Sequence, residues 1–335
     1  MTEQTFSYPL KFYALRDGTS SERAKCASGG IATALGRFII GKGGCVFGTG
    51  WNKDFAAETF CADNLDELEA FKGSRYVQGH IASSIYDEVE ERVKKGPVLF
   101  IGTPCQISAI NSRFPDGCDR LMTVDLICHG TPPASAFESE LRHLKKCHRI
   151  RTFDDIRFRG NDQSDFKLSI WNKGRCLLCR SAYIQPYFAG FLLSVNLRES
   201  CYHCPFARPE RISDITLGDY IVKNPYAPFA NKDGNISCMS ANTDKGLALV
   251  NEFLKSSDTI EAYERDYCER LEYAPALREP ARRNELSSKY AELIKKFPPA
   301  MAIRLTLFPV LLSRKISLLK VRIKEIFRTS VPSRS

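Results

Sequence analysis

Apolar residues recur at helical and at strand spacings along the first 150 residues, and the two kinds of spacing alternate. Residues 31–40 and 81–95 place apolar side chains every three to four positions, which predicts helices that each bury one face. Residues 97–102 and 121–128 are almost continuously apolar, which is typical of strands buried on both faces. The helices that should follow these strands are expected at residues 106–111 and 135–147. This order predicts an α/β fold: a central mixed sheet with flanking helices and with functional loops at the carboxyl ends of its strands.

The other segments complete this outline. Residues 10–25 are polar and charged, with a turn at Asp17-Gly18, and residues 222–236 form a loop rich in Pro, Asn and Gly. From about residue 151 the pattern indicates strands, and beyond residue 257 it indicates basic C-terminal helices. Further strands are expected at 45–50, 55–61, 156–159, 167–171 and 215–220, and further helices at 64–71 (capped by Asn64) and 244–254.

The cysteine content changes the picture. The chain has 335 residues, 43% of them hydrophobic, so its core needs no disulfides, yet it contains 13 cysteines. The number is odd and no basic-then-apolar signal peptide opens the chain, so we expect reduced thiols and a cytoplasmic location. Closely spaced reduced thiols indicate metal or iron–sulfur ligation, while a single cysteine is as often a small buried apolar residue.

The charge is +9, and Lys and Arg are densest after Arg278. Met301 to Phe327 mixes basic and apolar residues, with Pro309 expected to kink or split the segment. Two interpretations stay open: a helix on an anionic membrane surface, peripheral at the inner membrane, or a helix docked on the protein's own core or a partner. No apolar run is long enough to span a membrane, and no interleaved basic and aromatic strand motif predicts nucleic-acid binding.

Four cysteines lie in loops that suit ligation. Cys105 and Cys128 each follow a buried strand, and Cys201 and Cys204 form a CxxC with Pro205 directly after it. A second pair, Cys176 and Cys179, precedes the first at a separation close to that of a zinc ribbon. Spacing alone therefore leaves a zinc-stabilised binding or scaffold protein beside an iron–sulfur protein. For Cys176 and Cys179 we favour core packing, because they flank two leucines beside a strand-like segment and not a glycine knuckle.

Two other segments could hold a phosphate or a planar ring. Ser28, Gly29 and Gly30 open the helix that contains Thr33, with Ser28 near its N-cap, and a glycine turn at a helix start suits a pyrophosphate. Its alternative is an ordinary helix start. The second segment combines cations, hydrogen-bonding groups and an aromatic ring around one glycine; its alternative is a solvated turn. Its candidate residues are Lys72, Ser74, Arg75, Tyr76 and Gln78.

His129 and two carboxylates have less distinctive surroundings. His129 follows Cys128, so it is either a proton donor near a cofactor or a structural cap on the loop that contains Pro132. Asp214 and Asp219 flank a short strand, and we expect both to fix the cysteine loop by accepting backbone hydrogen bonds.

Taken together and in order, these motifs resemble the coenzyme F420 hydrogenase/dehydrogenase beta-subunit family, in particular its short bacterial members encoded with polysaccharide biosynthesis genes. The resemblance extends from about Ser28 to Leu254. It is carried by the segments Ser28-Gly29-Gly30, Lys72 to Gln78, Gly102-Thr103-Pro104-Cys105-Gln106, Asp125 to Gly130, Arg198 to Phe206 and Asp214 to Asp219.

The resemblance implies an oxidoreductase with FAD and one [4Fe–4S] cluster, with Cys105, Cys128, Cys201 and Cys204 as ligands, His129 as the catalytic residue and coenzyme F420 as a possible substrate. It implies that the glycine turn, the 72–78 segment, Thr103 and Gln106 contact the flavin. We divide the chain into an N-terminal flavin-binding region (1–97), an iron–sulfur and flavin domain (98–260) and a basic helical tail (261–335).

The chain also departs from the family pattern. Many members carry an N-terminal ferredoxin module, whereas only Cys26 precedes the glycine turn here, so a separate electron donor such as a ferredoxin is expected. Gly160-Asn161-Asp162 replaces the family's usual continuation after Phe158-Arg159, which leaves the substrate open between a small molecule and a glycan-linked compound.

Overall fold

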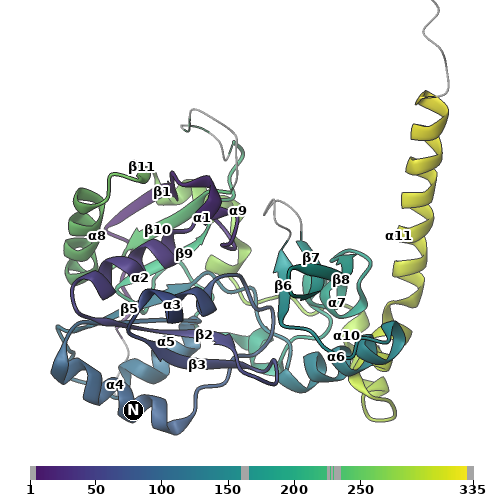
Figure 1. Ribbon diagram of the computed structural model, residues 1–335, viewed down its shortest axis with the longest axis horizontal. Helices are drawn as coiled ribbons and strands as arrows, with labels where there is room; N and C mark the ends of the chain where they lie inside the picture. Colours follow the sequence, from purple (N-terminus) through teal and green to yellow (C-terminus); the bar gives the residue numbers. More distant parts are fainter. Residues whose placement is uncertain (1–4, 160–165, 225–226, 228, 230–234, 330–335) are drawn as a thin grey trace, which may run out of the picture.

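The computed structural model describes residues 5–159, 166–224, 227, 229 and 235–329, with the backbone alone at 318 and 321–329. An eight-stranded sheet forms the main body, in the order β11-β1-β10-β9-β5-β4-β2-β3 (Figure 1). Its strands are β1 (Lys11–Asp17), β2 (Cys45–Trp51), β3 (Ala57–Ala62), β4 (Val98–Gly102), β5 (Leu121–Leu126), β9 (Ile215–Asp219), β10 (Ser237–Ala241) and β11 (Ile260–Glu264).

The sheet is mixed, and its pairing aligns several strand ends at one edge. β2, β4, β5 and β9 run parallel to one another, and the other pairs are antiparallel. Because β1 and β9 both pair antiparallel with β10, β1 points the same way as β9. The carboxyl ends of five strands, β1, β9, β5, β4 and β2, therefore lie along a single edge, where loops from distant parts of the sequence can meet.

Helices cover both faces of this sheet, as the continuous apolar runs predict. On one face, Val46 and Leu99 pack against α2 (Ile31–Gly41) and α8 (Asp244–Ser256). On the other, Phe47 and Phe100 pack against α4 (Ser83–Lys95) and α5 (Pro104–Asn111). Shorter helices are α1 (Ser20–Arg23), α3 (Leu65–Leu68) with η1 (Glu69–Phe71), and α9 (Tyr267–Tyr273) with η3 (Pro275–Leu277). The predicted α/β class with a mixed sheet and flanking helices is confirmed.

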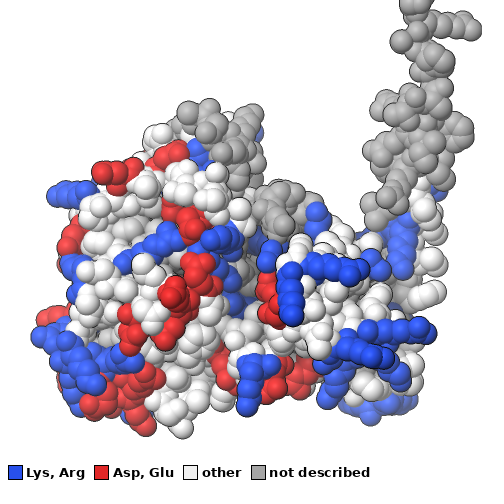
Figure 2. Space-filling view, viewed as in Figure 1, with Lys and Arg blue, Asp and Glu red and all other residues white. Residues whose placement is uncertain are grey.

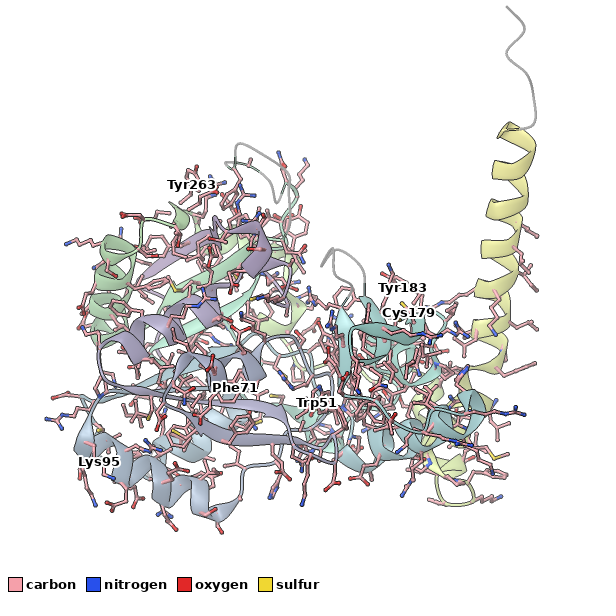
Figure 3. All side chains as sticks on the ribbon, in the orientation of Figure 1. Trp51, Phe71, Lys95, Cys179, Tyr183 and Tyr263 are labelled. Atoms are coloured by element: carbon pink, nitrogen blue, oxygen red, sulfur yellow. The ribbon has the colours of Figure 1, made fainter. Side chains whose placement is uncertain are left out.

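A smaller sheet lies beside the main body. It contains β6 (Asp155–Arg159), β7 (Phe166–Asn172) and β8 (Arg175–Ser181), and it packs with α6 (Ala134–His148) and α7 (Pro186–Leu192) around an aromatic core. Trp51, at the end of β2, connects the two parts: its Nε1 donates to the Ile156 carbonyl at 3.1 Å, and its ring stacks on Phe137. Figure 3 shows Trp51 at this junction. Figure 2 shows a hollow between the main body and the small sheet.

The C-terminal region is helical, as expected. α10 (Leu286–Leu293) precedes α11 (Pro299–Thr329), which contains Pro309 without being split into two helices. The first half of α11 packs on α6, α7 and α10 through Ile303, Leu307 and Leu311. Arg304 binds both carboxylate oxygens of the buried Glu140 of α6, at 2.5 and 2.7 Å. Docking on the protein's own core is thus confirmed for this half, whereas the second half extends away from the body (Figure 1).

Four strands are missing from the sequence-based outline: β1, β8, β10 and β11. The segment described as polar, residues 10–25, contains β1, a central strand whose last six residues are all buried. Arg16 and Asp17 belong to that strand, and Arg16 is buried because it pairs with Glu261 of β11 at 2.9 Å. The charged side chains of β1 therefore concealed a buried strand in the sequence pattern. β10 and β11 are each only five residues long. Gly160-Asn161-Asp162 and most of the 222–236 loop lie outside the described residues.

Candidate functional site

The sheet edge formed by five strand ends brings four cysteines close together. Cys105 lies in the first turn of α5, directly after β4, and Cys128 follows β5. Since Gly102 of β4 is opposite Asp125 of β5 in the parallel register, both loops leave the sheet at the same level. The other two cysteines, Cys201 and Cys204, come from the turn at η2 (Glu199–His203) and the residue that follows it.

Gly130 allows the η2 turn to pack directly on the Cys128 loop. Its φ of +116° lies in the region that favours glycine, and a Cβ here would lie 3.2 Å from the Cβ of Cys201 and 2.9 Å from Leu197 Cδ1. The contact is fixed by the backbone N–H of Arg198, which donates to the Thr131 carbonyl at 2.9 Å. A side chain at position 130 would therefore push the turn that carries Cys201 and Cys204 away from the Cys128 loop.

The thiols affect one another electrostatically. Burial is the main cause that raises the pKa of Cys128 to about 12; Cys105, Cys201 and Cys204 contribute to the rise, and the N–H of Gly130 opposes it by donating to the sulfur. Burial likewise raises the pKa of Cys204, with Cys105 and Cys201 contributing. The raised pKa values of Cys128 and Cys204 suit a positively charged inorganic core, because such a core stabilises bound thiolates.

The arrangement differs from a site for a single metal ion. Within the described residues, no group of three or more His, Cys, Asp or Glu side chains is placed to hold one ion. Cys176 and Cys179, the second pair of the zinc alternative, lie on β8 of the small sheet and are exposed, so the predicted core packing of these two is wrong. Figure 3 labels Cys179 next to Tyr183. The four cysteines of a zinc ribbon are therefore not assembled.

A buried ion pair supports both cysteine loops. Arg211 Nη2 and Asp125 Oδ2 are 2.5 Å apart, and both side chains are almost completely buried. The same guanidinium donates to the carbonyls of Phe206 and Arg208, at 3.3 and 3.1 Å. Asp125 is three residues before Cys128, and Phe206 is two residues after Cys204. The pair thus connects the end of β5 to the chain that follows the CxxC, and sequence reasoning did not identify Arg211.

The glycine turn lies at the same edge, next to β1 and β10. Gly29 packs so closely there that a Cβ would lie 2.8 Å from Ser237 N and 2.9 Å from the Leu15 carbonyl oxygen. Gly30, at φ +85°, is the N-cap of α2, so the cap is two residues beyond Ser28, whose hydroxyl donates instead to the Ile236 carbonyl at 3.2 Å. No side chain caps α2, and its first N–H groups therefore remain available to an anion. Thr33 lies one turn on, 3.6 Å from the Cys26 sulfur.

The 72–78 segment forms part of the wall beside this edge. Lys72 is almost buried and binds Glu22 at 2.8 Å and Glu69 of η1. Arg75 donates to the carbonyls of Phe71, Gly73 and Ala70, so it closes the end of η1. The N–H of Gln78 donates to the Pro132 carbonyl at 3.0 Å, which connects the segment to the Cys128 loop.

Tyr76 is held within the aromatic core between the two sheets. Its ring contacts Phe158, Phe188 and Phe191, with centroid separations of 4.9 to 5.6 Å. Its hydroxyl accepts hydrogen bonds from Arg159 at 2.9 and 3.0 Å, and Ser74 also bonds to it. Arg159 in turn binds Asp219, at the end of β9, at 2.6 Å. This chain of contacts spans the hollow between the sheets, and sequence reasoning did not assign Arg159.

Thr103 and Gln106 form a capping box at the start of α5. The backbone N–H of Thr103 donates to Gln106 Oε1 at 2.8 Å, and the Thr103 hydroxyl lies 3.2 Å from the Cys105 sulfur. Gln106 Nε2 lies 3.5 Å from the Gly79 carbonyl, next to the 72–78 segment. The two residues thus fix Cys105 and connect it to that wall.

His129 is oriented by the end of α7. Its Nε2 is 3.0 Å from the Ser194 hydroxyl, its ring also bonds the backbone of Phe191, and it meets the Phe191 ring edge-on. Burial lowers the pKa of His129. These contacts connect the Cys128 loop to α7 rather than capping Pro132.

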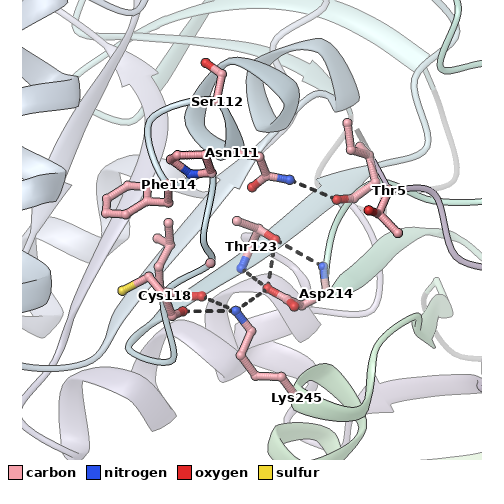
Figure 4. Close-up of a pocket in the computed structure, with 12 residues that line it drawn as sticks. Thr5, Asn111, Ser112, Phe114, Cys118, Thr123, Asp214 and Lys245 are labelled. Atoms are coloured by element: carbon pink, nitrogen blue, oxygen red, sulfur yellow. Dashed lines mark hydrogen bonds and ion pairs between the residues drawn. The ribbon is translucent and has the colours of Figure 1, made fainter. Parts of the chain in front are cut away.

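Asp214 lies at the opposite edge of the sheet, so the expectation that it fixes the cysteine loop is wrong. Its carboxylate accepts from the N–H and hydroxyl of Thr123, both at 2.9 Å, and binds Lys245 at 3.1 Å (Figure 4). These groups line a cavity of about 260 Å³ that also includes Asn111 and Cys118. Because Asp214 precedes β9, this cavity is separated from the four thiols by the length of the strands.

Replacing Gly29 by alanine is expected to displace the glycine turn, since the new Cβ would collide with backbone atoms of β1 and β10. The loss of stability should be about 1–3 kcal/mol, measured by urea unfolding. Gly41, at the end of α2, has a negative φ, and no atom lies within 4 Å of the place that a Cβ would take there. Gly41→Ala is therefore the matched control and should leave stability unchanged or slightly higher. Equal effects of the two substitutions would contradict the close packing of Gly29.

Comparison with known proteins identifies a family and a similar fold. A family model for the C-terminal part of the coenzyme F420 hydrogenase/dehydrogenase beta subunit matches residues 96–266, just over half of the chain. A similar solved structure comes from the F420-reducing [NiFe] hydrogenase complex of Methanosarcina barkeri, studied by xenon derivatization. It is 16% identical, the match covers 78% of this chain and 84% of that chain, and the TM-score is 0.52, a likeness of fold. No curated protein sequence matches the chain.

Proposed function

Since the chain belongs to the coenzyme F420 hydrogenase/dehydrogenase beta-subunit family, we propose that this oxidoreductase is a cytoplasmic iron–sulfur flavoprotein with FAD and one [4Fe–4S] cluster. When bound, FAD exchanges a hydride with an organic substrate, and the cluster carries single electrons. The observation that carries the proposal is the meeting of Cys105, Cys128, Cys201 and Cys204 at one sheet edge, from three separate loops.

A cluster suits these four thiols better than one metal ion does. A four-iron core holds its four sulfur ligands further apart than a single tetrahedral ion does. The four thiols influence one another, yet no three of the described His, Cys, Asp or Glu side chains are placed for one ion. In the proposal, Gly130 keeps Cys201 against the Cys128 loop, and the Asp125–Arg211 pair fixes both loops before the cluster is inserted.

The glycine turn and the adjoining wall support a flavin site. The uncapped N-terminus of α2 would bind the pyrophosphate through backbone N–H groups, aided by Ser28, Gly29 and Gly30. In the 72–78 segment, Lys72 is held by Glu22 and Glu69, and it shapes the wall together with Ser74, Arg75, Tyr76 and Gln78 through contacts within the protein. Thr103 and Gln106 would adjoin the ring, because they stand between Cys105 and Gly79.

His129 is the proposed proton donor, with Ser194 orienting its ring. Replacing His129 by asparagine is expected to slow substrate reduction by about 100-fold, because a positioned acid contributes a factor of this order. Iron and flavin content should stay at the level of the unmodified protein. If the rate is unchanged while both cofactors are bound, His129 is only a structural link between the Cys128 loop and α7.

The substrate and the electron donor are proposed by chemical class. Coenzyme F420, another small molecule or a glycan-linked intermediate in polysaccharide biosynthesis would exchange the hydride, and a ferredoxin-like protein would exchange electrons with the cluster.

Protein purified without oxygen should contain about four iron atoms and one FAD per chain, and reduced F420 or reduced ferredoxin should bleach its flavin absorption. Colourless protein with stoichiometric zinc would reject the proposal in favour of a zinc-stabilised binding protein. Bound flavin that no donor reduces would indicate a scaffold that has lost its activity.

A further inference from the structure

A stripe of apolar side chains runs along α11 on the side turned away from the protein. The six residues of this stripe are all exposed, with Phe308 at 63% and Leu319 at 58%; they are Met301, Leu305, Phe308, Leu312, Ile316 and Leu319. At 3.6 residues per turn they fall within an arc of about 80°. A scattered exposed apolar residue needs no explanation, but a continuous line of six along one helix does.

The stripe is separate from the face by which α11 docks. The docking face carries Ile303, Leu307 and Leu311, which are buried against α6, α7 and α10. On a helical projection this face lies opposite the stripe. α11 is therefore apolar on two sides, and the contacts within the described chain use only one of them.

The charge around the stripe is almost entirely positive. Pro299–Thr329 contains seven Lys and Arg residues and a single acidic residue, Glu325. Lys315 and Lys320 are exposed beside the stripe. The last turn of α6 adds Lys145 and Lys146, and Lys295 and Lys296 follow α10. Figure 2 shows Lys and Arg gathered on this part of the molecule, with acidic groups more frequent on the main body.

This charge decides between the possible occupants. Two copies of α11 that paired along the stripe would bring like charges together, whereas paired helices normally place opposite charges beside their apolar seam. Anionic lipid headgroups complement the positive charge, and the boundary below them accepts the apolar side chains. An exposed apolar stripe flanked by basic residues is typical of helices that lie in a membrane interface.

We propose that α11 seats the protein on the surface of a membrane that contains anionic lipids, with the stripe buried at the headgroup boundary. The helix does not span the bilayer: no helix in the described part of the chain is long and apolar enough for that. The inference stands on α11 alone and does not depend on the proposed cofactors.

The test is co-sedimentation of the full chain with vesicles of phosphatidylcholine, with and without phosphatidylglycerol. The full chain should bind the anionic vesicles and should dissociate at high salt. Leu312→Glu/Leu319→Glu should weaken this binding by about tenfold or more, because both side chains leave the interface and add negative charge. Leu10→Glu/Leu65→Glu is the matched control: these leucines are equally exposed, but they lie before β1 and in α3 on the main body, so binding should stay within about twofold.

Two results would overturn the proposal. One is equal binding by the Leu312→Glu/Leu319→Glu variant and the control variant, with circular dichroism showing both folded. The other comes from sedimentation velocity without vesicles: a dimer that Leu312→Glu/Leu319→Glu converts to a monomer would assign the stripe to a second copy of the chain. Because neither readout uses iron, flavin or activity, failure here leaves the proposed function untouched.

Discussion

Replacing Cys128 by serine is expected to remove the iron–sulfur cluster, lowering the iron content of anaerobically purified protein from about four atoms per chain to less than about one. The other three thiols all act on Cys128, and its loss would leave the cluster with three of its four proposed ligands. The measurement is iron and acid-labile sulfide content together with the visible absorption spectrum.

Cys176→Ser is the matched control for this experiment. Cys176 is exposed on β8, away from the sheet edge, and its replacement should leave the iron content unchanged. The comparison also separates the two metal hypotheses, because a zinc-ribbon site would need Cys176 and Cys179 together with Cys201 and Cys204. Loss of bound metal in Cys176→Ser, with full retention in Cys128→Ser, would contradict the assignment of the ligands.

Replacing Asp125 by alanine is expected to lower the free energy of unfolding by about 3–5 kcal/mol, the range observed when one partner of a buried ion pair is removed. The Arg211 guanidinium would remain buried without its carboxylate, and its hold on the chain after Cys204 would weaken. The measurement is urea unfolding of protein prepared without iron, so that cluster loss does not contribute to the change.

An exposed ion pair gives the control for Asp125. Lys11 and Glu264 also pair across neighbouring strands, but both side chains face solvent, so Glu264→Ala should cost about 1 kcal/mol or less. A second variant tests the cause. Asp125→Leu/Arg211→Met removes both charges and should recover part of the lost stability. If Asp125→Ala costs no more than Glu264→Ala, the buried pair does not support the cysteine loops.

Sequence patterns predicted the part of the site that depends on buried parallel strands. β4 and β5 are buried on both faces and mostly apolar, so their ends and the loops that carry Cys105 and Cys128 could be located from the sequence pattern. The glycine turn was also found, because α2 has a clear apolar period and begins directly after Gly30. Here the local sequence and the tertiary environment favour the same structure.

The remainder depends on contacts between residues far apart in the sequence. β1 carries charged residues that only Glu261 and other distant partners make compatible with burial. Arg159 and Arg211 acquire their roles from Asp219 and Asp125, and nothing in their own segments indicates this. Cys176 and Cys179 show the reverse error: two apolar neighbours suggested burial, but β8 lies in a small sheet that leaves both thiols exposed.

The division of the chain at residues 97 and 260 remains a prediction. Strands from both sides of residue 97 share the main sheet, and β11 begins at Ile260. The three regions therefore describe where the proposed cofactor contacts fall along the sequence.

An anomalous difference map at the iron absorption edge, from crystals grown without oxygen, would locate the metal directly. We expect one strong iron peak between Cys105, Cys128, Cys201 and Cys204, at the carboxyl ends of β4 and β5. A map with no iron there, or a zinc peak beside Cys176 and Cys179, would contradict the four-thiol cluster site.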